Sequence, residues 1–231
     1  MNPLVIIPAY RKPEQLERCK LALAEQTVKA DVFVHDNSEK NIGFTRAVNL
    51  GLRSAINDRY RYAIILNQDC YLESNAIAVM TGFMDAHPRC AIGGIKQLLA
   101  GDPDVIIHGG ATIAYPAGHH IVGRVSAGDC TESRQMPWVN GACMIVRLSA
   151  LIDFGLMDER MFLVGSESDW CYRARWHGWE VWYIADAVCQ HEQGASAKPS
   201  DEVLKIIAAD MKVWGAKWIG STAYAQLREL P

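Results

Sequence analysis

Apolar residues follow two different spacings along the first third of the 231-residue chain. Short runs of consecutive apolar residues, typical of buried strands, alternate with stretches in which apolar positions recur every three to four residues, as on one face of a helix. These spacings predict strands over residues 4–7, 31–35 and 62–66, and helices that begin at Pro13, Gly43 and Ser74. Three strand–helix units in succession predict a parallel sheet with helices on its faces.

Helix starts are indicated by the residues that precede the apolar spacing. Pro13 suits the first helical position, where its missing N–H loses no hydrogen bond. Ser74 and Ser200 have hydroxyl groups that can cap a helix by accepting a hydrogen bond from its first turn. We expect Ser200 to open a terminal helix whose inward residues are Val203, Ile206, Ile207, Met211 and Trp214.

The spacing becomes irregular between Gly93 and Pro137. This stretch is rich in glycine, and we interpret it as an irregular sheet edge with loops and short β-like pieces over 105–107 and 111–115. Regular patterns then predict strands over 142–146 and 181–184 and helices near 149–154 and 167–177. No repeat, low-complexity tract or linker divides the sequence, so we expect a single domain.

The composition narrows the class of protein. Half of the residues are hydrophobic, 21% are charged and the formal net charge is −3, as in an ordinary globular protein. The lack of a basic run disfavours non-specific binding to nucleic acids. No apolar stretch approaches the roughly 20 residues that span a bilayer, and the apolar run at the N-terminus is too short for a signal peptide.

The seven cysteines are odd in number and scattered, without a C-x-x-C pair. This pattern disfavours zinc ribbons and thioredoxin chemistry. Several of them, such as Cys143, lie among apolar residues, where a free cysteine behaves as a small hydrophobe. We therefore expect reduced thiols in a soluble, cytoplasmic protein.

Polar and turn-forming residues follow each of the first three predicted strands. Ligands of open parallel sheets bind beyond the carboxyl ends of the strands, so these residues are expected to share one edge and to form a site. Each segment alone is also an ordinary turn sequence. The three segments are Pro8-Ala9-Tyr10, Asp36-Asn37-Ser38 and Asn67-Gln68-Asp69.

An ordered series of short motifs extends over most of the chain. The first half carries Val5-Ile-Ile-Pro8-Ala-Tyr10, Asp36-Asn37-Ser38, Asn41-Ile-Gly43-Phe44-Thr-Arg46-Ala-Val-Asn49-Leu-Gly51 and Leu66-Asn67-Gln68-Asp69. The second half carries Asn140-Gly-Ala142-Cys-Met144, Arg147, Gly155-Leu-Met157-Asp158-Glu159, Glu167-Ser-Asp169-Trp-Cys171-Tyr-Arg173, His191 and Ser196. In this order the motifs resemble the inverting glycosyltransferases of family 2, from Leu4 to about Ser196.

The resemblance implies a GT-A fold, an α/β architecture in which a mostly parallel central sheet is flanked by helices. It divides the single domain into a nucleotide-binding half over residues 1–97, an acceptor and catalytic half over 98–199, and a C-terminal helix over 200–231.

The resemblance also implies a divalent metal, Mn²⁺ or Mg²⁺, bound by Asp69 and His191. Asp69 stands at the last position of the family's D-x-D element, here Asn67-Gln68-Asp69. Such cations prefer oxygen ligands and bridge the phosphates of a nucleotide diphosphate, and an imidazole is compatible with manganese beside a carboxylate. A lone histidine is otherwise an ordinary surface or core residue. The other six histidines match no motif and receive no role.

The donor is expected at the ends of the first strands. By the resemblance, the nucleobase and ribose lie across Pro8, Ala9, Tyr10 and Asp36, and the diphosphate is approached by Asn41, Gly43 and Arg46. Asn67 and Gln68 are also expected among the donor-binding residues. Gly43 permits close backbone approach, and Arg46 offers a fixed positive fork to phosphate oxygens. The alternative for Arg46 is an exposed helix arginine without a ligand.

The general base is the main departure from the family pattern. The family has Glu-Asp where this chain has Ser166-Glu167, which makes Glu167 the residue that removes the acceptor proton. We expect Ser166 to cap the helix that begins at Glu167. The N-terminus of a helix favours the ionised form of a carboxylate, which is the form that a base requires. Asp169 is the alternative base. A third possibility is that both carboxylates lie at an exposed helix start and have no catalytic role. Three nearby tryptophans, Trp170, Trp176 and Trp179, predict instead that this region is largely buried.

The acceptor side is expected to contain Trp138, Asn140, Gly141 and Ala142, which would line the sugar pocket. Trp138 is either a platform for a sugar ring or a core residue. Residues 98–136 are expected to recognise the acceptor or to form a lid.

The resulting hypothesis is an inverting, metal-dependent transfer of a hexose or deoxyhexose from a UDP- or dTDP-sugar to an acceptor hydroxyl. The acceptor is a glycan, a protein side chain or a modified nucleobase, and the oligomeric state stays open. One alternative is a catalytically silent sugar-nucleotide-binding module of a larger assembly, which the unusual Ser166 suggests. A nucleotidyltransferase is disfavoured, because Pro8-Ala-Tyr-Arg-Lys12 has a basic pair without the glycine-rich loop of such enzymes.

Overall fold

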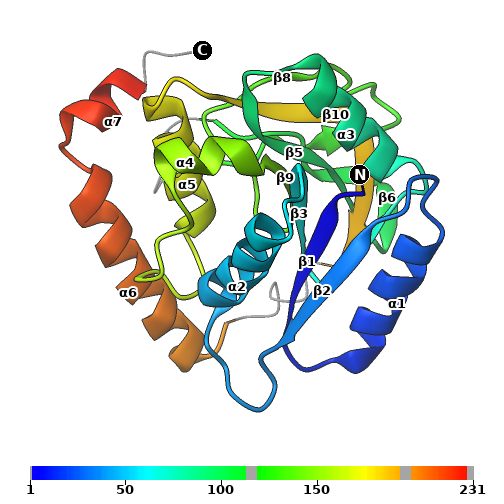
Figure 1. Cartoon of the computed structure of the whole chain (residues 1–231), viewed down its shortest axis with the longest axis horizontal. Helices are drawn as coiled ribbons and strands as arrows, with labels where there is room; N and C mark the ends of the chain where they lie inside the picture. The colour runs from blue at the N-terminus through cyan, green and yellow to red at the C-terminus, as the bar shows by residue number, and fades with distance from the viewer. Residues whose placement is uncertain (1, 113–118, 193–198, 228–231) are drawn as a thin grey trace.

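Ten strands form one large sheet in the computed structural model, which describes residues 2–112, 119–192 and 199–227 (Figure 1). The main path of the sheet runs β2-β1-β3-β9-β5-β10-β4, while β6 pairs with β5 and β7, and β8 pairs with β10. The strands are β1 (Leu4–Ala9), β2 (Asp31–Asp36), β3 (Tyr62–Leu66), β4 (Cys70–Leu72), β5 (Cys90–Leu99), β6 (Asp102–His108), β7 (Gly123–Arg124), β8 (Arg134–Gln135), β9 (Cys143–Arg147) and β10 (Glu180–His191).

Five of the seven strands on the main path run in one direction, in line with the mostly parallel sheet that the resemblance implied. β1 pairs in parallel with β2 and β3, and β5 pairs in parallel with β10. β9 lies between these groups and is antiparallel to both neighbours, so β2, β1, β3, β5 and β10 all run in one direction. Their carboxyl ends therefore face the same edge of the sheet.

Helices cover both faces of the sheet. They are α1 (Pro13–Ala24), α2 (Phe44–Asn57), α3 (Ala76–Ala86), α4 (Leu151–Phe154), α5 (Ser166–Trp176), α6 (Asp201–Trp218) and α7 (Thr222–Leu227), with a short 3-10 turn η1 (Leu148–Ala150) before α4.

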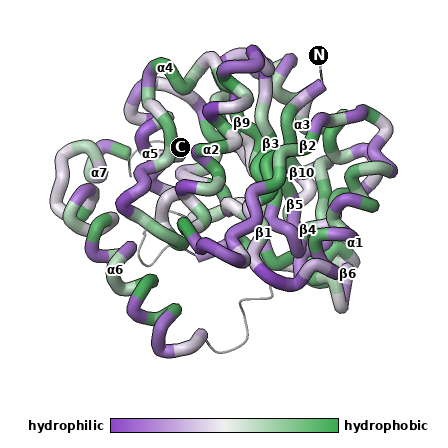
Figure 2. The backbone as a smooth tube through the Cα atoms, turned by 60° about the horizontal axis from the view of Figure 1, so that its bottom comes forward, coloured by the Kyte–Doolittle hydropathy of each residue, from purple (hydrophilic) through white to green (hydrophobic). Residues whose placement is uncertain are grey.

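The two faces have separate cores. α1 and α3 pack on one face through residues such as Cys19, Ile77 and Met80. α2, α5 and α6 pack on the other through residues such as Leu52 and Trp170. Figure 2 shows hydrophobic residues concentrated at β3, in the middle of the sheet, between helices of mixed character. The described helices are too short or too polar to cross a membrane.

The expectation of loops and an irregular edge after Gly93 is wrong for β5, which lies in the middle of the sheet between β9 and β10. Its glycines are sites of close packing. A Cβ atom at Gly93 would lie 2.7 Å from Ile184, and one at Gly94 would lie 2.4 Å from Val139. Glycine often indicates a loop in a sequence, but it is required in β5 because the side chains of neighbouring segments fill the space that a Cβ atom would occupy.

Two expected helix caps are corrected by the structure. Asn75, not Ser74, precedes α3, and it makes no capping hydrogen bond through its side chain. Gly165, in a left-handed conformation, precedes α5, so Ser166 is the first helical residue and caps nothing. The Ser200 cap is confirmed, because its side chain accepts a hydrogen bond from Val203 N.

Two predicted strands differ in length from those in the structure or are described only in part. β10 continues from the predicted residues 181–184 to His191, although Ile184 and Val188 flank an irregularity in its pairing with β5. The predicted β piece over 111–115 is described only at its start, where Ala111 bridges to His120. Ser196 and residues 113–118 lie outside the described residues.

Candidate active site

A cavity of about 420 Å³ lies beyond the carboxyl ends of β1, β2 and β3. The strand ends contribute Pro8, Tyr10, Asn37, Asn67, Gln68 and Asp69 to its wall. Three of the expected segments therefore do meet at one edge of the sheet. The first turns of α6 close another side through Glu202, Val203 and Ile206.

The loop after β1 has an unusual backbone. Arg11 and Lys12 both have positive φ angles, of 53° and 50°, in a region that non-glycine residues enter at a cost of about 1–2 kcal/mol each. The Gln68 side chain holds this loop, because its oxygen accepts from Tyr10 N at 2.8 Å and its nitrogen donates to the carbonyls of Tyr10 and Arg11. Ser38 Oγ also accepts from Arg11 N at 2.9 Å.

These contacts give Gln68 a structural role in addition to the donor binding expected of it. They also direct attention to Lys12, which the sequence analysis did not assign to the site. Lys12 lines the cavity, and its only sequence signal is its position shortly after the first strand.

Asp69 and His191 are brought together by the pairing of β4 with β10. His191 stands opposite Cys70 in this antiparallel pair. As a result, His191 Nε2 lies 3.3 Å from Asp69 Oδ1, and donor atoms of Asp69, Cys70 and His191 lie within 4.8 Å of one another. Imidazole nitrogen and carboxylate oxygen form a donor set that fits manganese and related divalent ions.

Glu167 stands in the first turn of α5. A Cβ atom at Gly141 would lie 3.5 Å from Glu167 Cβ and 3.4 Å from Phe44 Cζ, so both side chains pack around this glycine. Phe44 also lines the cavity. Burial raises the pKa of Glu167 to about 7, and the charge of Asp210 adds to the rise, although hydrogen bonds from backbone N–H groups oppose it.

The segment around Gly141 connects Glu167 to the Asp69 side of the site. Ala142 O accepts a hydrogen bond from Asn67 N at 2.8 Å. The Asn140–Ala142 segment therefore lies between the loop that carries Asp69 and the helix that carries Glu167. The three side chains on which the sequence hypothesis depends belong to one neighbourhood.

Asp169, the alternative base, is in a different environment. It is fully buried, and Arg173 Nε donates to its Oδ2 at 2.9 Å. Its Oδ1 accepts from Trp218 Nε1 at 2.9 Å and lies 2.6 Å from Lys217 Nζ. These partners from α5 and α6 engage both carboxylate oxygens of Asp169.

The expectation that residues of α5 are largely buried holds for Trp170 but not for Trp176. Trp170 is fully buried, whereas Trp176, at the end of the helix, is 50% exposed. Trp179, in the turn after α5, donates to Asp153 at 2.8 Å.

Several expected donor contacts lie outside the cavity wall. Arg46 Nε lies 3.7 Å from Glu159 on the exposed surface of α2, which matches the alternative of a ligand-free helix arginine. Asp36 is exposed, and hydrogen bonds from Ser38 lower its pKa. Ala9 is only 2% exposed.

Gly43 packs closely against a side chain at the entry to α2. Its φ angle is 87°, and a Cβ atom there would lie 2.6 Å from the Phe162 ring. Asn41 Oδ1 accepts from Gly43 N at 2.9 Å, which fixes the entry to α2. Asn41 and Phe162 both line the cavity, so Gly43 shapes the wall without contributing a side chain to it.

Trp138 is a core residue and not an exposed platform for a sugar. It is 4% exposed, its Nε1 donates to Thr112 O at 3.1 Å, and its ring meets the His120 ring edge-on. The expectation of a stacking surface fails because the aromatic face is covered by the protein itself.

A chain of polar groups extends from His191 into this region. His191 Nδ1 lies 3.2 Å from Gln97 Oε1, and Gln97 Nε2 donates to Asn140 Oδ1 at 3.2 Å. Asn140 N donates to His108 Nε2 at 3.4 Å, and the Nδ1 atoms of His108 and His120 are 2.7 Å apart. Burial lowers the pKa of both His108 and His120, which favours neutral rings.

Neither His108 nor His120 belongs to a motif, so this chain of contacts could not be predicted from the sequence. The carbonyl and amide groups that join the histidines come from separate strands and loops, and only the folded sheet brings them together.

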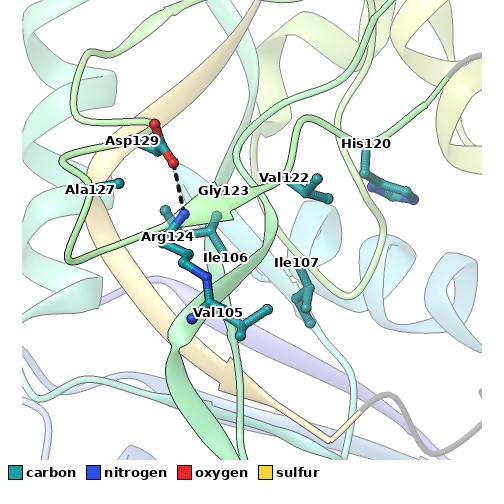
Figure 3. Close-up of a pocket in the computed structure, with 9 residues that line it drawn as sticks. All are labelled: Val105, Ile106, Ile107, His120, Val122, Gly123, Arg124, Ala127 and Asp129. Atoms are coloured by element: carbon teal, nitrogen blue, oxygen red, sulfur yellow. Dashed lines mark hydrogen bonds between the residues drawn. The ribbon is translucent and has the colours of Figure 1, made fainter.

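A second cavity, of about 650 Å³, lies beside β6 and the segment 119–129 (Figure 3). Its wall combines apolar side chains, among them Val105 and Val122, with His120, Arg124 and Asp129. Asp129 Oδ2 accepts from Arg124 N at 2.8 Å, the contact drawn as a dashed line in Figure 3. This cavity belongs to the stretch that was expected to recognise the acceptor.

The model of a protein family described as "Glycosyltransferase like family 2" matches residues 5–212 of the chain. The crystal structure of TarS from S. aureus is similar with a TM-score of 0.65 and 13% identity, covering 98% of this chain and 41% of that one. A crystal structure of GalNAc-T7 with UDP, GalNAc and Mn²⁺ is similar with a TM-score of 0.63 and 13% identity, covering 100% of this chain and 52% of that one.

The chain thus spans about half or less of the length of these two proteins, and at this identity they establish the fold alone. No curated protein matches the sequence.

Proposed function

This chain belongs to glycosyltransferase family 2 and has the GT-A fold, and from that premise we propose that it is an inverting, metal-dependent enzyme that transfers a sugar from UDP or dTDP to an acceptor hydroxyl. The donor occupies the cavity at the strand ends, with its base near Tyr10 and Asn37 and its diphosphate near Asp69. Tyr10 is 41% exposed at the cavity, and its ring suits stacking on a nucleobase.

Asp69 and His191 hold the divalent cation, Mn²⁺ or Mg²⁺, in this proposal. When bound, the ion supplies positive charge that stabilises the departing diphosphate. The 3.3 Å separation of His191 Nε2 from Asp69 Oδ1 supports this assignment, because the two donor atoms converge on one point from the turn before β4 and from the end of β10.

Glu167 acts as the general base. The acceptor oxygen attacks the anomeric carbon while its proton passes to the Glu167 carboxylate, and the bond from that carbon to the diphosphate oxygen breaks. A base is most effective when its pKa lies near the working pH, and a value of about 7 satisfies this condition. Asp169 is the weaker candidate, since Arg173, Lys217 and Trp218 engage it.

The observations that carry the proposal are the Asp69–His191 pair beside the donor-sized cavity, and the half-buried Glu167, which packs around Gly141 together with Phe44 of the cavity wall and has a raised pKa. A raised pKa suits a general base and favours the enzyme over the silent binding module. The acceptor is a glycan, a protein side chain or a modified nucleobase, for which we propose residues 98–136 as the recognition surface. The free thiols, six of them buried, support a cytoplasmic location.

Titration of UDP by calorimetry, with and without Mn²⁺, tests the metal site. Asp69→Ala should abolish the Mn²⁺-dependent part of UDP affinity, because the remaining imidazole cannot hold the ion alone. Asp58→Ala, which removes an exposed carboxylate at the end of α2, serves as the control. UDP affinity in the wild type that does not depend on Mn²⁺, Mg²⁺ or any other divalent ion would refute the metal assignment.

A further inference from the structure

Behind His191 lies a buried amide that the proposed mechanism does not use. Gln97 is 1% exposed and belongs to β5, next to β10 in the middle of the sheet. The parallel register sets Gln97 opposite Cys189 and Leu99 opposite His191. Gln97 is therefore diagonal to His191, and its side chain reaches the imidazole from a rigid strand.

The direction of every hydrogen bond in this group follows from a single backbone N–H. Ala142 N can only donate, and it donates to Asn140 Oδ1 at 2.7 Å. The oxygen of Asn140 thus faces both Ala142 and Gln97. The atom of Gln97 that lies 3.2 Å from this oxygen must then be its NH₂ group.

With its NH₂ group directed to Asn140, Gln97 turns its Oε1 toward His191. Oε1 can only accept, so the His191 Nδ1 atom, 3.2 Å away, carries a proton. A neutral imidazole protonated at Nδ1 has its lone pair on Nε2, the atom that lies 3.3 Å from Asp69 Oδ1.

We propose that Gln97 is a positioning residue that orients His191 and keeps its Nε2 lone pair available for the divalent cation, with Asn140 fixing the direction of the Gln97 amide. This inference rests on the proposed metal site of Asp69 and His191. Partners that hold the second nitrogen of a metal-bound histidine typically change metal affinity 10–100-fold when they are removed.

Two substitutions separate this role from simple packing. Gln97→Leu removes both the acceptor for His191 and the donor for Asn140 at similar volume. Gln97→Glu keeps an acceptor oxygen for His191 Nδ1–H but loses the donor to Asn140. A purely structural glutamine would be damaged by both changes, and more by the buried charge.

Gln26→Leu provides a matched control. Gln26 is also buried, at 2% exposure, and its amide bonds backbone groups such as Ile77 N, Glu73 O and Leu72 O, without a hydrogen bond to the side chains of Asp69 or His191 among the described residues. Its loss is expected to lower stability without changing metal affinity.

The experiment measures Mn²⁺ affinity of the full chain by electron paramagnetic resonance of the free ion. Gln97→Leu should weaken binding by about 10–100-fold, while Gln97→Glu and Gln26→Leu should stay within a few-fold of wild type or bind more tightly. In protein loaded with diamagnetic Mg²⁺, the Nδ1–H signal of His191 in ¹H–¹⁵N spectra should be protected in wild type and lost in Gln97→Leu.

Equal Mn²⁺ affinity in wild type and Gln97→Leu would overturn the inference and leave the metal site intact. The inference would also be overturned if Gln97→Glu weakened Mn²⁺ binding as much as Gln97→Leu does. Absence of Mn²⁺ and Mg²⁺ binding in the wild type would instead refute the proposed function, and this inference with it. Should Gln97→Leu fail to fold, Gln97→Met gives the same comparison with a more adaptable side chain.

Discussion

At the scale of single residues, Glu167 is set apart from the other carboxylates near the cavity. Asp169 is neutralised by close cations, whereas the half-buried Glu167 packs beside Gly141, forms no ion pair with a described cation and lies under the influence of Asp210. Its raised pKa follows from this contrast, because burial disfavours the charged form unless a partner compensates.

The pH dependence of turnover tests the role of Glu167. A base works when it is deprotonated, so kcat should be low below the pKa of about 7 and rise to a plateau above it. Glu167→Gln should lower kcat by about 10²–10⁴-fold and abolish this rise, with donor affinity unchanged. Near-normal turnover in Glu167→Gln would remove Glu167 from the mechanism.

The same pKa predicts a stability effect. Folding raises the pKa of Glu167 from 4.5 to about 7, so its favourable contribution is complete below pH 4.5 and is lost as the pH rises through 7. Glu167→Gln should therefore raise the melting temperature at pH 8 relative to wild type. Equal melting temperatures at pH 8 would mean that the glutamate is less buried than described.

Residue types were easier to predict than side-chain partners. The positions of Asp69, His191 and Glu167 followed from motifs, and the strand pairing then brought the first two together. The burial of Trp138 and the diversion of Arg46 to Glu159 depend on contacts between segments far apart in sequence, which local patterns do not encode.

At the scale of elements, the start of α2 depends on a glycine. Gly43→Ala adds a methyl group at a φ of 87° and 2.6 Å from Phe162, so it should lower the free energy of unfolding by about 2 kcal/mol or more. Gly82→Ala, at an exposed position of α3 where the new Cβ meets no atom of a neighbouring segment within 4 Å, should instead stabilise by about 0.5–1 kcal/mol. Urea unfolding of both variants measures the difference, and similar effects would contradict it.

Asp210, in α6, forms hydrogen bonds with the backbone of the loop before α5. Its carboxylate accepts from the backbone N–H groups of Phe162, Leu163 and Val164 at 2.7–2.9 Å and is 2% exposed. Asp210→Ala leaves these donors without an acceptor, so we expect a loss of about 3 kcal/mol in urea unfolding.

Asp210→Ala should also change the pH dependence of kcat, through the pKa of Glu167. Removal of the negative charge should lower the pKa of Glu167, so the rise of kcat should move to lower pH. Asp201→Ala, at the exposed start of the same helix, should change neither quantity. An unshifted pH profile in Asp210→Ala would show that the two carboxylates do not interact.

Predictions at this scale succeeded where an element has a clear local period. The strands 31–35 and 62–66 and the helix from Pro13 agree closely with β2, β3 and α1. β5 was missed because its glycines resemble a loop until Ile184 and Val139 are known to fill the space above them. The length of β10 was missed because its pairing with β5 is interrupted between Ile184 and Val188 and resumes only from Val188 onward.

At the scale of the whole molecule, the parallel units could be expected from the order of strands and helices, and the motif series implied the family. The position of β9, antiparallel between β3 and β5, could not be predicted in this way, because β9 lies more than forty residues along the chain from either neighbour. That position matters for the site, because the Asn140–Ala142 segment that leads into β9 is what connects Glu167 to the Asp69 loop.

The arrangement of the thiols has a practical consequence. Six of the seven cysteines are buried, and only Cys130 is of intermediate exposure. It follows Asp129, which lines the second cavity in Figure 3. A maleimide reagent at mildly alkaline pH would thus modify one position without any mutagenesis, and an environment-sensitive fluorophore attached there would report directly on whether a trial acceptor enters that cavity.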